Sequence, residues 1–192
     1  MCAAPGGPCG TGLVKIAGKQ NRPASLACAD LPACGRRPAG MNLLIRRMIP
    51  ADLEQVVAID QASFSLPWPA RSFQFELSDN PASRSWVAEL GGRIVGMIVL
   101  WLIVDEAHIA TIATHPQFRR QGIGGRLLTH ALSSVKAEGA QRAFLEVRAG
   151  NSAAQEMYRR SGFVEDGRRP RYYKDNHEDA ILMSLKDLPE ER

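Results

Sequence analysis

Three strand-like runs in the middle of the chain, joined by very short turns, limit the possible folds more than any other feature. Residues 86–90 and 94–104 are rich in aliphatic, β-branched and aromatic side chains, and the two glycines between them have the composition of a tight hairpin turn. An Asp-Glu pair marks a second turn before a third run at 107–114. Because connections this short join antiparallel neighbours, the runs predict an antiparallel meander.

Helices and strands alternate on both sides of this meander. A helix with one apolar face is expected from Ile123 to the break at Gly139. The other expected elements are a strand at 42–47, a helix near 50–64, a break at 65–69, a short helix at 71–77, a strand at 143–149, a helix at 152–161 with a Ser-x-x-Gln capping box, and a strand at 180–185. This order predicts one α+β domain with a mixed, mostly antiparallel central sheet flanked by helices.

The positive charge lies almost entirely in the first 40 residues. The formal net charge is +4, and residues 1–40 contain five basic residues and one acidic residue. The other 152 residues contain 19 of each sign, so the expected domain has no global electrostatic reason to bind nucleic acid. No apolar run reaches membrane-spanning length, so no membrane segment is expected.

The four cysteines also lie in the first 40 residues, and their spacing matches no common zinc pattern. The histidines His108, His115, His130 and His177 lack metal-site spacing as well, so no metal is expected. We interpret the cysteine usage as typical of a reducing, cytoplasmic setting. Residues 1–40 are predicted to be disordered, or to reflect a start codon assigned too far upstream of Met41, and residues 41–192 to form the domain, which we expect to be monomeric.

A glycine-rich segment at 119–125, Arg-Arg-Gln-Gly-Ile-Gly-Gly, stands between an expected strand and an amphipathic helix. It can be a simple turn, or a cradle in which backbone N–H groups, the helix N-terminus and the arginines bind a pyrophosphate. It is not a P-loop, because no Gly-Lys-Ser/Thr follows. It also fails the dinucleotide fingerprint, because Leu127 occupies the third glycine position.

This segment resembles the signature Gln/Arg-x-x-Gly-x-Gly/Ala of the GNAT family of N-acetyltransferases. Residues 112–116 and 151–163 are similar to that family's strand end beside the cofactor and to its next helix. The resemblance implies a sheet that splays at an acetyl-coenzyme A site. It also implies these cofactor-binding residues: Ile112, Ala113, Thr114, Arg119, Arg120, Gln121, Gly122, Ile123, Gly124, Gly125 and Asn151.

Within the GNAT family, residues 41–186 are most similar to the RimI-type ribosomal-protein alanine N-acetyltransferases. Three stretches carry this likeness, at 66–68, 145–148 and 172–180. One departure is Thr-His-Pro at 114–116, where that subfamily often has Val-Asp-Pro. The likeness implies direct transfer from acetyl-coenzyme A, in a ternary complex, to the N-terminal alanine of a small-subunit ribosomal protein.

The same likeness implies two catalytic residues. Glu146 lies in an apolar strand-like run and would be the general base, whereas the simpler interpretation is a carboxylate paired with a nearby arginine such as Arg148. Tyr158 lies on the helix expected at 152–161 and would protonate the departing thiolate, whereas the simpler interpretation is a core tyrosine.

The acceptor peptide is expected to bind between two segments far apart in the sequence. One contains Leu66, Pro67 and Trp68, and the other contains Tyr172 and Tyr173 followed by two acidic residues that would suit a basic peptide. Two alternatives stay open at this stage. The chain can be a GNAT enzyme for other protein N-termini or a small amine, or a catalytically silent module that binds an acyl-coenzyme A.

Overall fold

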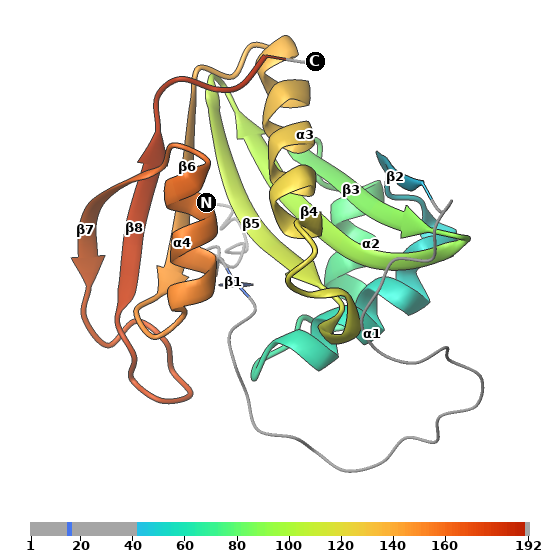
Figure 1. The fold of residues 1–192 in the computed structure, drawn as a ribbon, viewed down its shortest axis with the longest axis horizontal. Coiled ribbons are helices and arrows are strands. Elements are labelled where there is room, and N and C mark those ends of the chain that lie inside the picture. Colours follow the sequence, from blue (N-terminus) through green and yellow to red (C-terminus); the bar gives the residue numbers. More distant parts are fainter. Residues whose placement is uncertain (1–14, 17–41, 191–192) are drawn as a thin grey trace, which may run out of the picture.

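A computed structural model describes residues 42–190 together with the short strand β1 (Lys15–Ile16) (Figure 1). The predictions for the rest of residues 1–40 lie outside the described residues and stay predictions. In the described part, the prediction of an α+β domain with a mixed, mostly antiparallel sheet is confirmed.

Seven strands form one continuous sheet in the order β2-β3-β4-β5-β6-β8-β7. Neighbouring strands are antiparallel except β5 and β6, which are parallel. The strands are β2 (Leu43–Arg47), β3 (Ser83–Leu90), β4 (Arg93–Ile103), β5 (Glu106–Thr114), β6 (Arg142–Arg148), β7 (Val164–Arg169) and β8 (Ala180–Leu185). The helices are α1 (Leu53–Ser63), α2 (Ala70–Ser78), α3 (Ile123–Ala137) and α4 (Ser152–Arg160), with short 3-10 turns at Pro50–Asp52 and Pro116–Phe118.

The predicted meander is present as β3, β4 and β5. Both glycines of the first turn have positive φ, 58° at Gly91 and 80° at Gly92, which is the backbone geometry that a two-residue hairpin requires. The second turn lies one residue earlier than expected, because Val104 adopts φ 57° and is 91% exposed. Val104 is therefore a turn residue and not the end of the strand.

Strand β7 is the element that the sequence did not predict. Its six residues, Val-Glu-Asp-Gly-Arg-Arg, are exposed or half-exposed and show no apolar alternation. The strand pairs only with β8, at the edge of the sheet, so it needs no buried face of its own. Its last residue, Arg169, nevertheless reaches the candidate site described below.

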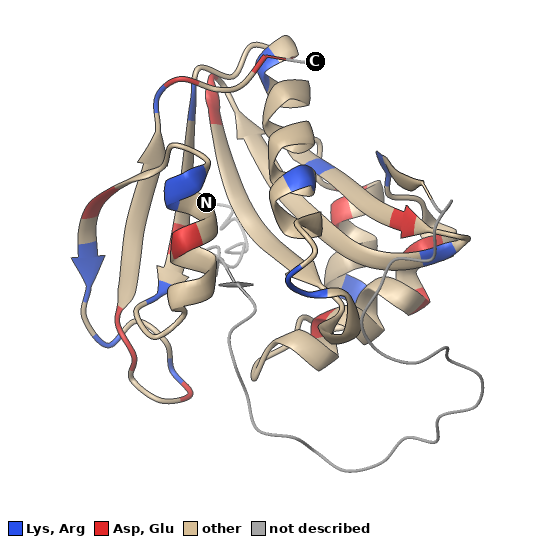
Figure 2. Cartoon of the chain, viewed as in Figure 1, with Lys and Arg blue, Asp and Glu red and all other residues tan. Residues whose placement is uncertain are grey.

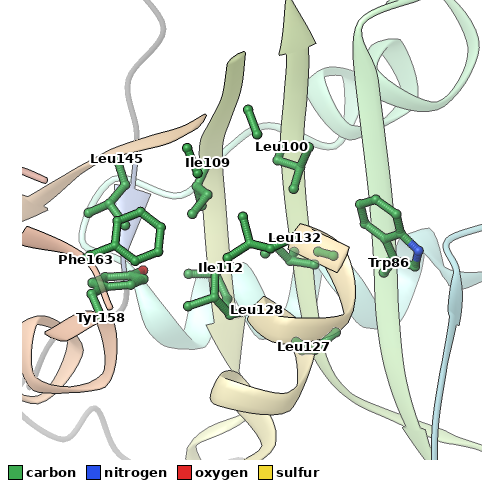
Figure 3. Close-up of a cluster of buried hydrophobic side chains, with 14 of the residues drawn as sticks. Trp86, Leu100, Ile109, Ile112, Leu127, Leu128, Leu132, Leu145, Tyr158 and Phe163 are labelled. Carbon is green, nitrogen blue, oxygen red and sulfur yellow. The ribbon is translucent and has the colours of Figure 1, made fainter. Parts of the chain in front are cut away.

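Two hydrophobic cores lie on opposite faces of the sheet. Helices α3 and α4 cover one face, where Leu127, Leu145 and Tyr158 belong to the larger core (Figures 1 and 3). Helices α1 and α2 cover the other face, where Val56 and Phe73 belong to the smaller core. Burial of apolar area on both faces is the main force that holds the helices to the sheet.

The sheet opens between its two parallel strands. Pairing between β5 and β6 is limited to three residue pairs, from Glu106 with Arg142 to His108 with Phe144. Both strands continue beyond these pairs without bonding to each other, and they diverge (Figure 1). Strand β1 pairs with β5 in this gap, at Thr111 and Ile112. Past its three pairs with β6, β5 is therefore paired on this edge only with the two-residue strand β1 in the described part of the chain.

Candidate active site

A cavity of about 560 Å³ lies between the end of β5, the glycine-rich loop, the first turn of α3 and one side of α4. Nine of the residues that the sequence nominated for cofactor binding line it: Ile112, Ala113, Thr114, Arg119, Arg120, Gly122, Ile123, Gly124 and Gly125. Sequence reasoning missed the far wall, which α4 supplies through residues that include Ala153, Glu156, Met157 and Arg160. Helical periodicity identified α4 but could not show which side faces the cavity.

The two remaining nominated residues, Gln121 and Asn151, do not line the cavity. Asn151 is buried, and its side chain accepts a hydrogen bond from the Ala154 N–H at 3.2 Å, so Asn151 is the N-cap of α4. The expected capping box that starts at Ser152 is therefore wrong. Instead, the Gln155 side chain donates to the carbonyl oxygens of Arg148 and Ala149 and fixes the turn between β6 and α4.

Glycine is required at two positions of the loop for different reasons. Gly122 is the N-cap of α3 and has φ 76°, in the left-handed region that L side chains rarely adopt. A Cβ on Gly124 would lie 3.1 Å from the Met157 sulfur and 3.5 Å from the Thr114 Oγ1. Small residues here keep the first turn of α3 open to the cavity. The N–H groups of a first helical turn have no partner within the helix, so this end of the cavity suits an anion.

The two arginines of the loop have different surroundings. The half-buried Arg119 donates to the Thr114 carbonyl at 3.2 Å and to the Ser63 hydroxyl at 3.1 Å, so it braces the loop against β5 and α1. Burial lowers the pKa of Arg119 from its usual value. Arg120 is exposed and forms no hydrogen bond or ion pair with another described residue. Figure 2 shows basic residues on this loop just before α3. Arg120 is therefore the arginine that can reach a ligand phosphate.

Glu146 lies on the opposite side of the splay from the cavity-lining end of β5. Its neighbours on β6, Leu145 and Val147, point into the core under α3 and α4, so Glu146 faces the α1–α2 side of the sheet. One carboxylate oxygen accepts a hydrogen bond from Arg169, and the other is buried without a hydrogen-bond partner among the described residues. The sequence suggested Arg148 as a salt-bridge partner, but Arg148 pairs with Asp175 and Glu178.

Tyr158 is fully buried on α4 and packs edge-on against Phe163, with ring centroids 5.6 Å apart. Figure 3 shows its hydroxyl directed toward β5. This hydroxyl has no hydrogen-bond partner among the described residues. Burial, and to a smaller extent the nearby Tyr173, raises the pKa of Tyr158 well above its usual value. The phenol is therefore protonated at neutral pH and can serve as a proton donor.

Buried polar atoms without partners occur on several elements that border the splay. Besides the Glu146 oxygen and the Tyr158 hydroxyl, the hydroxyls of Thr111 and Tyr173 are buried and have no hydrogen-bond partner in the described part of the chain. Each such group costs about 1–3 kcal/mol when nothing pairs with it, and native proteins seldom keep them without a function. Thr111 was not a sequence candidate, because its environment depends on where the pairing of β5 ends. These atoms are available to a polar ligand at the splay.

The two nominated acceptor segments lie together on the α1–α2 side. Asp60 accepts from the Trp68 N–H at 2.6 Å, and the Trp68 ring lies 5.3 Å from that of Phe73, so the 66–68 segment is anchored to α1 and α2. A hydrogen bond from the Ser65 hydroxyl to Asp175 joins this segment to the loop after Tyr172 and Tyr173. Leu66 is 41% exposed and Pro67 is also exposed.

Tyr172 and Tyr173 pack against each other, and the two acidic residues expected beside them are already paired. The rings of Tyr172 and Tyr173 lie 5.3 Å apart at 84°. Burial, and after it the Glu146 carboxylate, raises the pKa of Tyr172 to about 12. Asp179 accepts from the Arg171 N–H at 2.9 Å, and Glu178 accepts from Arg148 at 3.2 Å. These two carboxylates support the loop and do not form an open acidic surface.

No group of three or more His, Cys, Asp or Glu side chains among the described residues is arranged to hold a metal ion. None of the helices in that part of the chain is long and apolar enough to cross a membrane.

Comparisons with known proteins agree with this geometry. The sequence pattern of the Acetyltransferase (GNAT) family matches residues 53–163. The chain is 34% identical over 138 residues to the ribosomal protein bS18-alanine N-acetyltransferase of Escherichia coli K12. The aligned region covers 70% of this chain and 90% of that protein.

Solved structures give the same result. The crystal structure of the ribosomal-protein-S18-alanine N-acetyltransferase from Escherichia coli superimposes with a TM-score of 0.70 and 30% identity, covering 79% of this chain and 98% of the other. A Bacillus anthracis protein solved in complex with acetyl coenzyme A matches with a TM-score of 0.64 and 28% identity, covering 76% and 98%. The family pattern spans more than half of this sequence, and the Escherichia coli relative exceeds 30% identity over most of its own length. This chain therefore belongs to the GNAT family of acetyltransferases.

Proposed function

We propose that this protein transfers an acetyl group from acetyl-coenzyme A to the α-amino group of the N-terminal alanine of ribosomal protein bS18, in the cytoplasm. The observation that carries the proposal is the arrangement at the splay. A cavity suited to an anion opens between the end of β5, α3 and α4, and Tyr158 is buried on α4 on this same side of the sheet. The Glu146 carboxylate, on the neighbouring strand β6, faces the other side. The names of the Escherichia coli relatives supply the acceptor.

Acetyl-coenzyme A fits the cavity in one direction. Its pyrophosphate would bind at the first turn of α3, where Gly124 keeps the N–H groups accessible and Arg120 supplies a positive charge. The pantetheine arm would then follow the end of β5 past Thr114 toward the splay. A backbone N–H near Ala113 would polarise the thioester carbonyl. The acetyl group would thus face Glu146 across the gap.

The transfer then proceeds directly, with the acceptor amine attacking the thioester carbonyl. Glu146 takes a proton from the acceptor ammonium, directly or through a water molecule, and the carboxylate oxygen that Arg169 does not engage supports this role. The C–N bond forms as the C–S bond breaks, and Tyr158 gives a proton to the departing thiolate. Burial raises the pKa of Tyr158, so its phenol carries a proton before the transfer.

An α-amine is the acceptor that this site can handle most easily. The ammonium of a protein N-terminus has a pKa near 8, so its deprotonation at pH 7 costs about 1 kcal/mol. A lysine with a pKa of about 10.4 costs roughly 4.6 kcal/mol. A single carboxylate base is sufficient for the first case and a poor match for the second, which favours N-terminal acetylation.

The proposal is tested with peptides. The protein is incubated with acetyl-coenzyme A and a synthetic peptide that copies the N-terminus of bS18, and the products are mapped by tandem mass spectrometry. We expect acetylation at the α-amine of the first alanine. A peptide with the same sequence, a blocked N-terminus and one added lysine is the control, and it should stay unmodified. Modification of the lysine, or no product from the bS18 peptide, contradicts the proposal.

The same experiment separates the two other candidate functions. An enzyme for other protein N-termini or for a small amine would leave the bS18 peptide untouched and acetylate members of a panel that varies the first residue. A silent acyl-coenzyme A-binding module would bind acetyl-coenzyme A in calorimetry without turning over any acceptor. The presence of both Glu146 and Tyr158, each with a buried polar atom that has no partner among the described residues, favours catalysis over this last function.

A further inference from the structure

The most heavily connected side chain outside the proposed chemistry is that of Arg148, at the end of β6. It lies two residues after Glu146 and is therefore on the same face of the strand. Its side chain is only 16% exposed, and its guanidinium contacts two separate parts of the chain, Ser65 and the loop at 173–178. Strand β6 pairs with β8 through main-chain groups, so it does not need these side-chain contacts in order to form.

We propose that Arg148 is a positioning residue that joins the two walls of the acceptor site into one rigid unit and thereby determines how tightly the acceptor peptide binds. One wall is the segment 65–68 between α1 and α2. The other is the loop 170–179 between β7 and β8. This inference rests on the acceptor site proposed above.

The contacts span both walls. One terminal nitrogen of Arg148 lies 2.8 Å from Asp175 and 3.4 Å from the Ser65 hydroxyl. The other lies 3.1 Å from the Asn176 side-chain oxygen and 3.2 Å from Glu178. The Ser65 hydroxyl in turn donates to Asp175. The first wall is therefore joined to the second both directly through the guanidinium and through a carboxylate that the guanidinium holds.

The same side chain places an aromatic ring of the acceptor site. The guanidinium carbon lies 3.9 Å from the centre of the Tyr173 ring, a distance typical of a cation–π contact. Tyr173 is 1% exposed, so its ring is packed on all sides and Arg148 covers one of its faces. A displaced Arg148 would move this ring, whose hydroxyl is buried and has no hydrogen-bond partner among the described residues.

A guanidinium is required because of the number and geometry of these contacts. Its planar fork directs several N–H groups at fixed angles while its face stacks on a ring, which a lysine ammonium cannot reproduce. Burial opposes ionisation of Asp175, but the Ser65 and Arg148 hydrogen bonds hold the pKa of its carboxyl below the usual value. The charge pair is therefore intact across the neutral pH range in which the enzyme is assayed.

Four variants test this inference by steady-state kinetics with the bS18 peptide: Arg148→Ala, Arg148→Lys, Ser65→Ala and the control Arg142→Ala. Arg142 lies at the other end of β6 and makes a single long ion pair with Asp105 at 3.9 Å, so the control removes an arginine from the same strand without touching the acceptor site. Ser65→Ala removes one link between the walls and leaves every charge in place.

We expect the KM for the peptide to rise by about 10²-fold in Arg148→Ala, about 10-fold in Arg148→Lys and about 5-fold in Ser65→Ala, because small displacements of positioning groups have effects of this size. The KM for acetyl-coenzyme A should stay within about twofold of the wild-type value in all four variants, because the cavity lies on the other side of β5. If Arg148 only stabilises the fold, Arg148→Ala will have a lower Tm, and the folded fraction of that variant will keep the wild-type KM for the peptide. That result would overturn the inference.

Amide hydrogen exchange gives a second readout that does not depend on the acceptor. In Arg148→Ala and Ser65→Ala, residues 65–68 and 170–179 should both lose protection together, while Arg142→Ala leaves them unchanged. If the two segments respond independently, the inference is wrong. If the wild-type protein acetylates no N-terminal peptide, the proposed function fails, and the exchange result still decides whether Arg148 joins the two walls.

Discussion

Replacing Glu146 with glutamine separates a catalytic carboxylate from a structural one, because the change keeps the shape of the side chain and removes its ability to accept a proton. The structure sets the expected cost in stability. The partner of Glu146 is Arg169, whose side chain is 55% exposed. Ion pairs with an exposed member contribute about 0–1 kcal/mol, so the Tm should change little.

The expected loss of rate is much larger. Removal of a general base lowers kcat by about 10²–10⁴-fold, which corresponds to about 2.7–5.4 kcal/mol of transition-state stabilisation. The affinity for acetyl-coenzyme A should be unchanged, because Glu146 does not line the cavity. A variant that loses activity and keeps its Tm and its cofactor affinity therefore identifies Glu146 as part of the chemistry.

The pH dependence makes the prediction sharper. With an α-amine pKa of about 8, roughly a tenth of the acceptor is neutral at pH 7 and roughly nine tenths at pH 9. Glu146→Gln depends on this neutral fraction, so its kcat should rise about tenfold over that interval and recover part of the deficit. Pre-steady-state rates from pH 6.5 to 9.5, measured beside melting curves, give the profile. A rate close to wild type at neutral pH, or a deficit that stays constant as the pH rises, would refute the reasoning.

Other changes have distinct outcomes. Tyr158→Phe should stay slow even at pH 9.5, yet melt no earlier than wild type, because it removes a buried hydroxyl that has no partner; a lower Tm in its melting curve would contradict this. Gly124→Glu should abolish coenzyme A binding in calorimetry and leave the fold intact, because it puts a side chain and a negative charge into the first turn of α3. Arg120→Ala should weaken coenzyme A binding about 5-fold without a change in Tm, whereas Arg119→Ala should lower the Tm as well, since only Arg119 braces the loop. A chain that begins at Met41 should keep full peptide-acetylation activity, and loss of folding in that variant would show that residues 1–40 contribute to the domain.

The sequence predicted the elements that have strong periodicity and the loop that has distinctive chemistry. The meander, the helix from Ile123 and the glycine-rich segment all follow from local patterns of apolar residues and glycines. Strand β7 could not be predicted, because an edge strand with exposed side chains has no pattern that distinguishes it from a loop.

The contacts of the candidate site were less accessible to sequence reasoning. Glu146 was expected to have an arginine within its own strand as the simplest partner, and the structure gives it Arg169, 23 residues away. Arg148 was seen only as that possible partner, although it contacts residues at positions 65, 175 and 178. Such pairings depend on how distant segments meet in three dimensions, and no local spacing encodes them.

The short pairing between β5 and β6 has a consequence for how the molecule holds together. Among the described residues, strands β5 and β6 are paired at only three positions, at one end, and past that point the meander and the β6–β8–β7 part of the sheet diverge. A ligand bound between the diverging strands would contact both parts of the sheet. The contacts that bind such a ligand would therefore also hold the two parts together. Acetyl-coenzyme A would then bridge the two parts of the sheet while it is bound. The flexibility of the protein would fall when this co-substrate binds and rise again when coenzyme A leaves.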